Sequence, residues 1–298
     1  MSRDWEEQFR QWAKPPGKTE QERCDNAASA IRNGIKASDK LRSRGITVFV
    51  QGSYRNSTNV RRDSDVDVGI LCRDTLINDF PSGMNRDDFD LTPATYQYEQ
   101  YKEEIEAALV NHFGRSAVER GDKAFDVHET SYHVEADVAA FFEHRRYAKD
   151  GRYWEGVALR TDRDKTRIIN WPEQHYQNGC AKNNSTGTRY KSIVRVLKAL
   201  SNEMADQRVP GGEIPGFLVE CLVWNVPDDR FQHDTYTADV RSVLVFLYEN
   251  TKTDEACGEW VEVSGLKWLF RPTQKWTRLQ ANAFTYAAWN YVGLGGES

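Results

Sequence analysis

Near residue 50, five β-branched or aromatic residues run directly into a Gly-Ser turn, and this junction restricts the fold strongly. Residues 46–50 read Ile-Thr-Val-Phe-Val, a composition that predicts a buried strand. Gly52 and Ser53 follow almost at once, and small residues let backbone N–H groups approach a phosphate closely. The junction therefore predicts a strand with a phosphate-binding turn at its end.

A second strand-like segment follows about a dozen residues later and carries two carboxylates. Residues 65–71 begin with strict alternation, which on a strand places Asp65 and Asp67 on one face and the valines between them on the other. Like charges this close repel, and hard oxygen ligands suit Mg²⁺ or Mn²⁺. Taken alone, the Asp-Val-Asp pattern also fits the solvated acidic face of an edge strand.

A third carboxylate is expected from another alternating run at residues 132–141. Glu135 and Asp137 share one predicted face of this strand, and apolar residues share the other. A two-metal site needs a carboxylate from a neighbouring strand. We expect Asp137 to supply it, with Glu135 as the second choice; a half-exposed strand with an ordinary polar face is the alternative.

The strand, the Gly-Ser turn and the later Asp-x-Asp together resemble the signature of polymerase β-like nucleotidyltransferases. Within that group the chain resembles the bacterial CD-NTases, clade E in particular. These relatives of cyclic GMP-AMP synthase make cyclic oligonucleotide messengers in CBASS anti-phage defence. The resemblance spans roughly residues 46–225 and rests on the segments 51–54, 58–61, 64–67, 133–138, 169–175, 178–179, 182–183, 190–191, 195–198 and 214–222.

The resemblance implies an α/β fold: a polymerase β-like nucleotidyltransferase core with a mixed sheet, plus a C-terminal helical lobe. It implies a catalytic lobe at residues 1–165, including an N-terminal spine helix, and a helical lobe at 166–298. The active site is expected in the cleft between the two lobes, which is where small-molecule sites concentrate.

The resemblance also assigns roles in catalysis. Two Mg²⁺ or Mn²⁺ ions are expected, with Asp65 and Asp67 on both ions and Asp137 on the one that serves the acceptor hydroxyl. Gly52 and Ser53 are expected to hold the β- and γ-phosphates, and Gln51 is a further nucleotide-binding candidate.

Basic residues beyond the sheet complete the expected nucleotide site. Lys182 and Lys198 are nucleotide-binding candidates, and Lys198 lies one heptad after Lys191 on a predicted helix. A solvated helical lysine is the alternative for Lys198. The chain departs from many relatives at Gly216, where they carry serine near the phosphates, so a hydroxyl contact there is in doubt.

Asn170 is the candidate for nucleobase choice. In the family, a position after the third carboxylate steers between purine and pyrimidine, and asparagine there is associated with uridine. An amide offers both a donor and an acceptor, which complement the N3–H and O4 of uracil. The alternative is that Asn170 caps a turn before Pro172.

Composition limits the partners and the compartment. The net charge of −5 argues against a long nucleic acid acceptor, which needs many phosphate contacts. No apolar run approaches about 20 residues, so we expect neither membrane contact nor a signal peptide. Five scattered cysteines read as reduced thiols of a cytoplasmic protein. We expect a monomer.

The leading functional hypothesis is a cyclic dinucleotide synthase that uses ATP and UTP and signals to a downstream effector in anti-phage defence. Cyclic UMP-AMP is the expected product, with cyclic di-UMP next. Two alternatives stay open: a linear nucleotidyltransferase (oligoadenylate-type, or one that modifies a protein or small molecule), and a nucleotide-binding sensor without turnover.

Periodicity predicts several helices and two irregular segments. We expect helices at residues 5–13, 96–113, 188–203, 216–226, 237–250 and 273–292, and one opening with Thr19 as N-cap and Glu22 in a capping box. Residues 73–94 are expected to form a surface insertion, and 145–166 a polar stretch.

Overall fold

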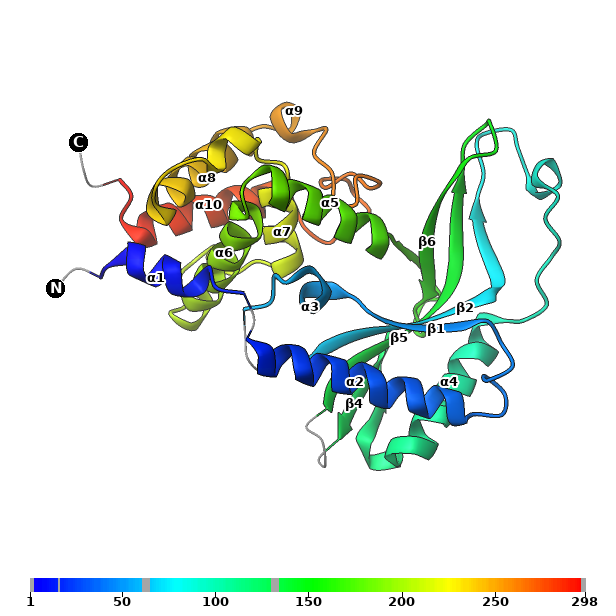
Figure 1. Ribbon diagram of the computed structural model, residues 1–298. Coiled ribbons are helices and arrows are strands. Elements are labelled where there is room, and N and C mark those ends of the chain that lie inside the picture. Colours follow the sequence, from blue (N-terminus) through cyan, green and yellow to red (C-terminus); the bar gives the residue numbers. More distant parts are fainter. Residues whose placement is uncertain (1–2, 16, 61–64, 130–133, 296–298) are drawn as a thin grey trace. The chain divides into compact units, whose positions relative to one another are not determined.

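The computed structural model describes residues 3–15, 17–60, 65–129 and 134–295. The chain forms two compact units (Figure 1), which we describe separately. The sheet unit comprises residues 17–55 and 63–172, and the helical unit comprises 1–16, 56–62 and 173–298. This division differs from the expected single boundary at 165/166, because the N-terminal segment and a short internal segment belong with the helices.

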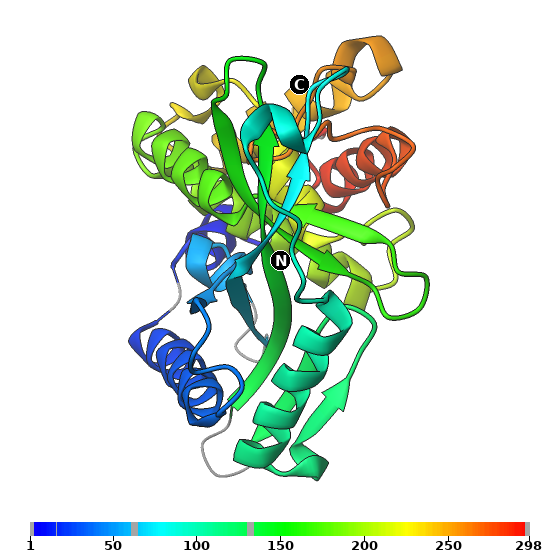
Figure 2. The same cartoon turned by 90° about the vertical axis from the view of Figure 1, so that its right-hand side faces the viewer.

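The sheet unit is built on a mixed sheet in the order β1-β2-β5-β4-β3, with β6 pairing with both β5 and β7. Strands β2 and β5 are parallel, and the other pairs are antiparallel. β5 is a long curved strand (Figure 2) that pairs with β4 through its first residues and with β6 through its last. The strands are β1 (Ile46–Val50), β2 (Val66–Asp79), β3 (Val118–Arg120), β4 (Phe125–Glu129), β5 (Val134–Tyr147), β6 (Tyr153–Arg160) and β7 (Arg167–Asn170).

Two segments predicted to be irregular are partly strand. β2 continues to Asp79, with a register shift between Cys72 and Leu76, so the expected insertion at 73–94 begins only after that residue. The expected polar stretch at 145–166 contains the end of β5 and all of β6, which form a hairpin. Both predictions were wrong for these strand residues, because pairing with a neighbouring strand satisfies their backbone groups regardless of local polarity.

Two helices cover one face of this sheet. Helix α2 (Lys18–Ala37) and helix α4 (Tyr98–Phe113) lie beside each other against it (Figure 1). Tyr101 of α4 is fully buried and donates its hydroxyl to the Ile70 carbonyl of β2, 2.8 Å away. α2 already begins at Lys18, so Thr19 is not the N-cap that the capping box predicted. α4 ends at Gly114, as predicted, with a φ of 90°.

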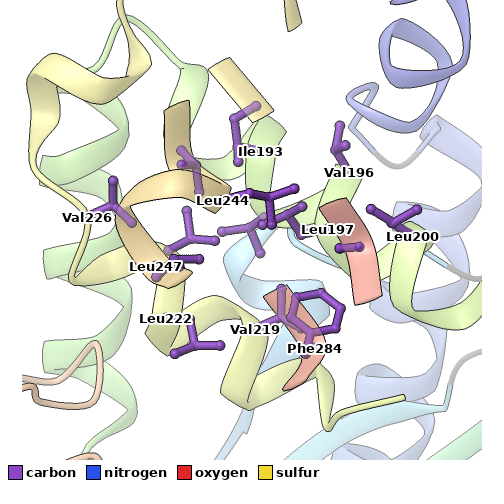
Figure 3. Packing of buried hydrophobic residues seen from close by; sticks show 14 of the residues in the cluster. Ile193, Val196, Leu197, Leu200, Val219, Leu222, Val226, Leu244, Leu247 and Phe284 are labelled. Atoms are coloured by element: carbon purple, nitrogen blue, oxygen red, sulfur yellow. The ribbon is translucent and has the colours of Figure 1, made fainter. Parts of the chain in front are cut away.

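The helical unit packs around its own helix α6, whose central part is buried (Figure 3). Val196 and Leu197 of α6 pack in one cluster with Val219, Leu244 and Phe284. The short helix η3 (Asp228–Phe231) precedes α8. The unit contains α1 (Trp5–Trp12), α5 (Pro172–Ser185), α6 (Arg189–Asp206), α7 (Gly216–Trp224), α8 (Tyr236–Asn250), α9 (Asp254–Cys257) and α10 (Arg278–Val292).

Arg195 explains why distant segments belong to the helical unit. Its guanidinium donates to the Ala13 carbonyl after α1 (Nε to O, 2.9 Å) and to the Ser57 carbonyl (Nη1 to O, 2.6 Å). Burial lowers the pKa of Arg195 to about 10, so the group stays charged at neutral pH. One buried cation therefore satisfies the backbone of two chain segments far from α6 in sequence.

Two further observations concern the whole described chain. All five cysteines fall within the described ranges, and none forms a disulfide. In the same ranges, the helices are too short or too polar to span a bilayer.

Candidate active site

The Gly-Ser turn lies directly against β2, the strand that carries Asp67. Gln51 donates its backbone N–H to the Asp67 carbonyl (2.9 Å), which fixes the end of β1 to β2. The short helix α3 (Gly52–Asn56) follows, and Gly52 has a φ of 67°. A Cβ at Gly52 would lie only 2.0 Å from Asp67 Oδ2. Glycine is therefore required, because the Asp67 carboxylate occupies the space that any side chain would fill.

Three aspartates form one row across adjacent strands. Asp137 of β5 is the register partner of Asp67 on β2 and also of Asp126 on β4. Neighbouring strands lie about 4.8 Å apart, and register partners present their side chains on the same face. The predicted pairing of Asp67 with Asp137 thus places two candidate ligands side by side, and Asp126 adds a third carboxylate to them.

The electrostatics of the row favour a bound cation. Burial raises the pKa of Asp137 to about 6, with further contributions from the charges of Asp65 and Asp126 and a hydrogen bond to Asp126. Burial and the charge of Glu135 likewise raise the pKa of Asp65. Asp65 and Asp137 therefore resist ionisation, and a divalent cation bound between the carboxylates would remove the repulsion among them.

The donor set fits a hard divalent ion in its chemistry. Carboxylates on adjacent strands are the ligands Mg²⁺ prefers, and the row supplies several of them. In the side-chain conformations found across the described residues, no three His, Cys, Asp or Glu groups are already gathered as a metal site. Binding would therefore require the carboxylates to rotate towards one another from a backbone that already aligns them.

Glu135, the second choice for the third carboxylate, has a different environment. It is exposed and contacts His128, its register partner on β4. This contact raises the pKa of His128. Glu135 is thus engaged by a neighbouring imidazole, whereas Asp137 faces other carboxylates.

Lys198 lies in a buried network of the helical unit. Its ammonium donates to Thr58 Oγ1 and to Glu220 Oε2, each at 3.0 Å, and Thr58 also donates to Glu220 Oε2 at 2.9 Å. His175 Nε2 lies 2.8 Å from Glu220 Oε1. Burial alone would raise the pKa of Glu220, but Lys198 and His175 hold it well below its usual range. The lysine is therefore paired, not solvated.

Lys182 and Lys191 also have partners within the helical unit. The ammonium of Lys182 donates to the Val226 carbonyl (2.7 Å) and to Asp228 Oδ1 (2.8 Å), at the start of η3. The ammonium of Lys191 lies 3.4 Å from Cys180 Sγ. The structure thus gives Lys182 a role in connecting α5 to η3, and its predicted contact with nucleotide stays a prediction.

Gly216 begins α7 beside the network. A Cβ at this position would meet the aliphatic stem of Lys198 at 3.6 Å, which is ordinary van der Waals contact. The serine that many relatives carry would therefore fit here without strain.

Asn170 ends β7 and pairs with Val157 of β6. It is half-buried and immediately precedes Trp171 and helix α5. Some residues that carry the family resemblance, namely Arg61, Ser64 and His133, lie outside the described residues.

The sequence interpretation missed Asp126. The run Phe125-Asp126-Val127 does alternate, and both flanking side chains are fully buried. That alternation could have flagged a strand with one outward carboxylate. Its place beside Asp137 depends on strand register, which the local sequence does not give.

Comparisons with known proteins agree on one family of nucleotidyltransferases. The profile of the cGAS/DncV-like nucleotidyltransferase C-terminal helical domain matches residues 177–293. A cyclic dipyrimidine nucleotide synthase from Cecembia lonarensis is 41% identical over 297 residues, covering 98% of this chain and 99% of that protein.

Two solved structures are similar over almost the whole chain. The c-UMP-AMP synthase of Rhodothermus marinus, solved with Apcpp and Upnpp, has a TM-score of 0.86 at 28% identity and covers 98% of both chains. The cyclic dinucleotide synthase of Elizabethkingia meningoseptica, solved with GTP and Apcpp, has a TM-score of 0.79 at 36% identity and covers 97% of this chain and 98% of that one. The predicted mixed α/β core with a C-terminal helical region is confirmed.

Proposed function

Because this chain belongs to the cGAS/DncV-like nucleotidyltransferase family, clade E, we propose that it joins two nucleoside triphosphates into a cyclic dinucleotide that contains uridine. The chain is a nucleotidyltransferase. The observation that carries the proposal is 41% identity, over nearly the full length, to a cyclic dipyrimidine nucleotide synthase. The aspartate row on β2, β5 and β4 supports it with a physical basis for the chemistry.

We propose metal-binding roles for Asp65 and for two carboxylates of the row. We assign Asp65 and Asp67 to two divalent ions, and Asp137 to the one beside the acceptor hydroxyl. Two Mg²⁺ or Mn²⁺ ions would, when bound, lower the pKa of that 3′-hydroxyl and neutralise the departing pyrophosphate. Asp137 must be ionised to act as a ligand, and its raised pKa of about 6 makes this pH-dependent near neutrality.

The triphosphate is assigned to the turn after β1 and to basic residues. Gly52 and Ser53 are small, half-buried residues whose backbone N–H groups can approach a phosphate, and Gln51 adjoins them. An ammonium has three donors, and Lys198 uses two of them on Thr58 and Glu220 among the described residues, which leaves one for a phosphate. Lys182 is the second basic candidate.

Asn170 is assigned to base choice. Its amide can present a donor to O4 of uracil and an acceptor to N3–H. The relatives' names support a pyrimidine: one is a cyclic dipyrimidine nucleotide synthase, and another is a c-UMP-AMP synthase. We propose cyclic UMP-AMP from ATP and UTP as the product, with cyclic di-UMP next.

The wider setting is also a proposal. We propose a cytoplasmic monomer whose product activates an effector in CBASS anti-phage defence, without a membrane or long nucleic acid partner.

Product analysis tests the proposal. The protein is incubated with all four NTPs and Mg²⁺ or Mn²⁺, treated with phosphatase, and the products are identified by mass spectrometry. A phosphatase-resistant cyclic product with UMP is expected. Linear oligonucleotides would favour an oligoadenylate-type or modifying enzyme, and the absence of product with NTP binding retained would favour a sensor. A cyclic product made only of purines would overturn the role of Asn170 but not the synthase assignment.

A further inference from the structure

Gly156 lies where strand β6 passes directly beneath the side chain of Trp171. A Cβ at position 156 would lie 2.6 Å from Trp171 Cε3 and 2.8 Å from the Asn170 carbonyl oxygen. Real Cβ atoms essentially never make contacts this short, so any larger residue would displace either the indole or the backbone of β7. Glycine inside a strand often marks such a close approach of another backbone.

Two side chains of β5 pack against the indole of Trp171. His144, the register partner of Gly156 on β5, meets it edge-on with ring centroids 5.2 Å apart. The Arg146 guanidinium lies over the ring, 4.7 Å from its centroid. His144 and Arg146 are two residues apart on β5 and therefore share a face.

Hydrogen bonding does not fix this ring. Trp171 is 3% exposed, and its indole N–H is buried with no hydrogen-bond partner in the described part of the chain. The position of the ring therefore depends on the space above Gly156. A methyl group there would have to push the ring away by about 0.8 Å to restore a contact of 3.4 Å.

Asn170 is tied to the same contact from the backbone side. It precedes Trp171 and pairs with Val157, the neighbour of Gly156. A displacement of the indole or of the Asn170 carbonyl moves the Asn170 side chain with it. Hydrogen bonds weaken steeply over a few tenths of an ångström and with angle, so a shift of this size is enough to spoil a two-point contact with a base.

We propose that Gly156 is a specificity-positioning residue: by leaving room for Trp171 it holds Asn170 in the position that selects uracil. Gly156 acts through its neighbours and does not itself touch substrate. The inference rests on the proposed role of Asn170 in base choice, and the experiment separates the two.

The test compares the uridine share of the product in four proteins: wild type, Asn170→Ser, Gly156→Ala and Gly69→Ala. Each is given equal concentrations of the four NTPs, and the product bases are quantified by mass spectrometry. Asn170→Ser is expected to lower the uridine share about tenfold, and Gly156→Ala at least about threefold, because each weakens the same hydrogen bonds.

Gly69→Ala is the matched control for crowding in the same sheet. A Cβ at this buried position on β2 would lie 2.4 Å from the Phe49 ring on β1, a clash as severe as that at Gly156. This variant is expected to lower the amount of product without changing the uridine share. A lower share in Gly69→Ala as well would make the effect a general result of crowding and would overturn the inference.

The remaining outcomes also distinguish the role of Gly156 from the role of Asn170. If Asn170→Ser lowers the uridine share and folded Gly156→Ala does not, the positioning role of Gly156 is refuted and the role of Asn170 stands. If Asn170→Ser leaves the share unchanged, the base-choice proposal fails and the inference fails with it. If circular dichroism shows Gly156→Ala unfolded, Trp171→Phe takes its place. That variant removes half of the ring that rests on Gly156, and an unchanged uridine share would then refute the inference.

Discussion

Asp137 lies between two other aspartates, Asp67 on β2 and Asp126 on β4. Burial, followed by the charges of Asp65 and Asp126, raises its pKa to about 6, above the ordinary value of 3.8. Since the folded state holds the proton more tightly than the unfolded state, this carboxyl stabilises the fold most at low pH. That contribution is lost as the pH rises through about 6.

Asp137→Asn should therefore separate stability from activity. The amide of the variant cannot ionise. In EDTA at pH 8, the free energy of unfolding of the variant should therefore exceed that of the wild type by about 1 kcal/mol, allowing for solvent screening. Near pH 4 the two free energies of unfolding should match. Product formation should fall at least about 100-fold because a metal ligand is lost. Urea denaturation at both pH values and initial rates measure the two effects.

Glu135→Gln is the matched control, two residues away on the same face of β5. Its side chain is exposed and pairs with His128, so its rate should stay within about threefold of the wild type. An inactive Glu135→Gln beside an active Asp137→Asn would assign the third ligand to Glu135 instead.

At the scale of elements, α5, α6 and α7 are joined by a buried charge network. His175 of α5, Lys198 of α6 and Thr58 each contact Glu220 of α7, whose carboxylate accepts their hydrogen bonds. A buried ion pair is costly to break from one side, because the remaining charge is left without compensation.

Lys198→Met and Glu220→Gln should each lower the free energy of unfolding by about 3 kcal/mol. The double variant should cost less than the sum of the two by at least about 1 kcal/mol, since neither uncompensated charge remains. Urea denaturation of the three variants measures this coupling. Lys191→Met, one heptad earlier on α6, is the control and should cost less than about 1 kcal/mol. Additive costs for Lys198 and Glu220 would contradict the network.

Gly216 at the start of α7 offers a second test at this scale. A Cβ at this position would make only ordinary van der Waals contacts. Gly216→Ala and Gly216→Ser should therefore each raise the free energy of unfolding by about 0.5 kcal/mol, because they reduce the entropy of the unfolded chain. If the phosphates lie nearby, Gly216→Ser alone should also lower the KM for NTP. Equal KM values in the two variants would place the triphosphate elsewhere.

At the scale of the whole molecule, the net charge of −5 limits the partners. The protein should sediment as a 34.3 kDa monomer, and it should show no binding to a 40-base-pair DNA or RNA duplex at about 10 µM protein and physiological salt. Fluorescence anisotropy tests the second point, with a basic DNA-binding protein as positive control. Binding that weakens steeply with salt would reveal a nucleic acid surface that the total charge conceals.

Local patterns in the sequence were sufficient for several parts of the fold. Strand β1, the alternation at Asp65 and Asp67, and the helices α4, α6 and α8 each follow from the spacing of apolar residues within a short window. Each of these elements buries one face, and the spacing of apolar residues in the sequence identifies that face.

Other parts depend on contacts between distant segments. Helix α5 was not among the expected helices, because its apolar periodicity is weak and its buried residues are His175 and Gly179. The partners of Lys198 lie 140 and 22 residues away in sequence. Asp126 joins the aspartate row only through the register of β4 on β5. Such contacts are set by tertiary packing, which a local pattern does not encode.

Counting bound metal ions tests most directly the central claim that the aspartate row is the catalytic centre. Mn²⁺ is titrated into the protein in the presence of a non-hydrolysable UTP analogue, at pH 8, where Asp137 is ionised. Electron paramagnetic resonance of the free ion gives the stoichiometry. The wild type and Glu135→Gln should bind about two ions per chain, whereas Asp67→Asn should bind fewer, or about 100-fold more weakly. Two ions bound to Asp67→Asn with wild-type affinity would contradict the account.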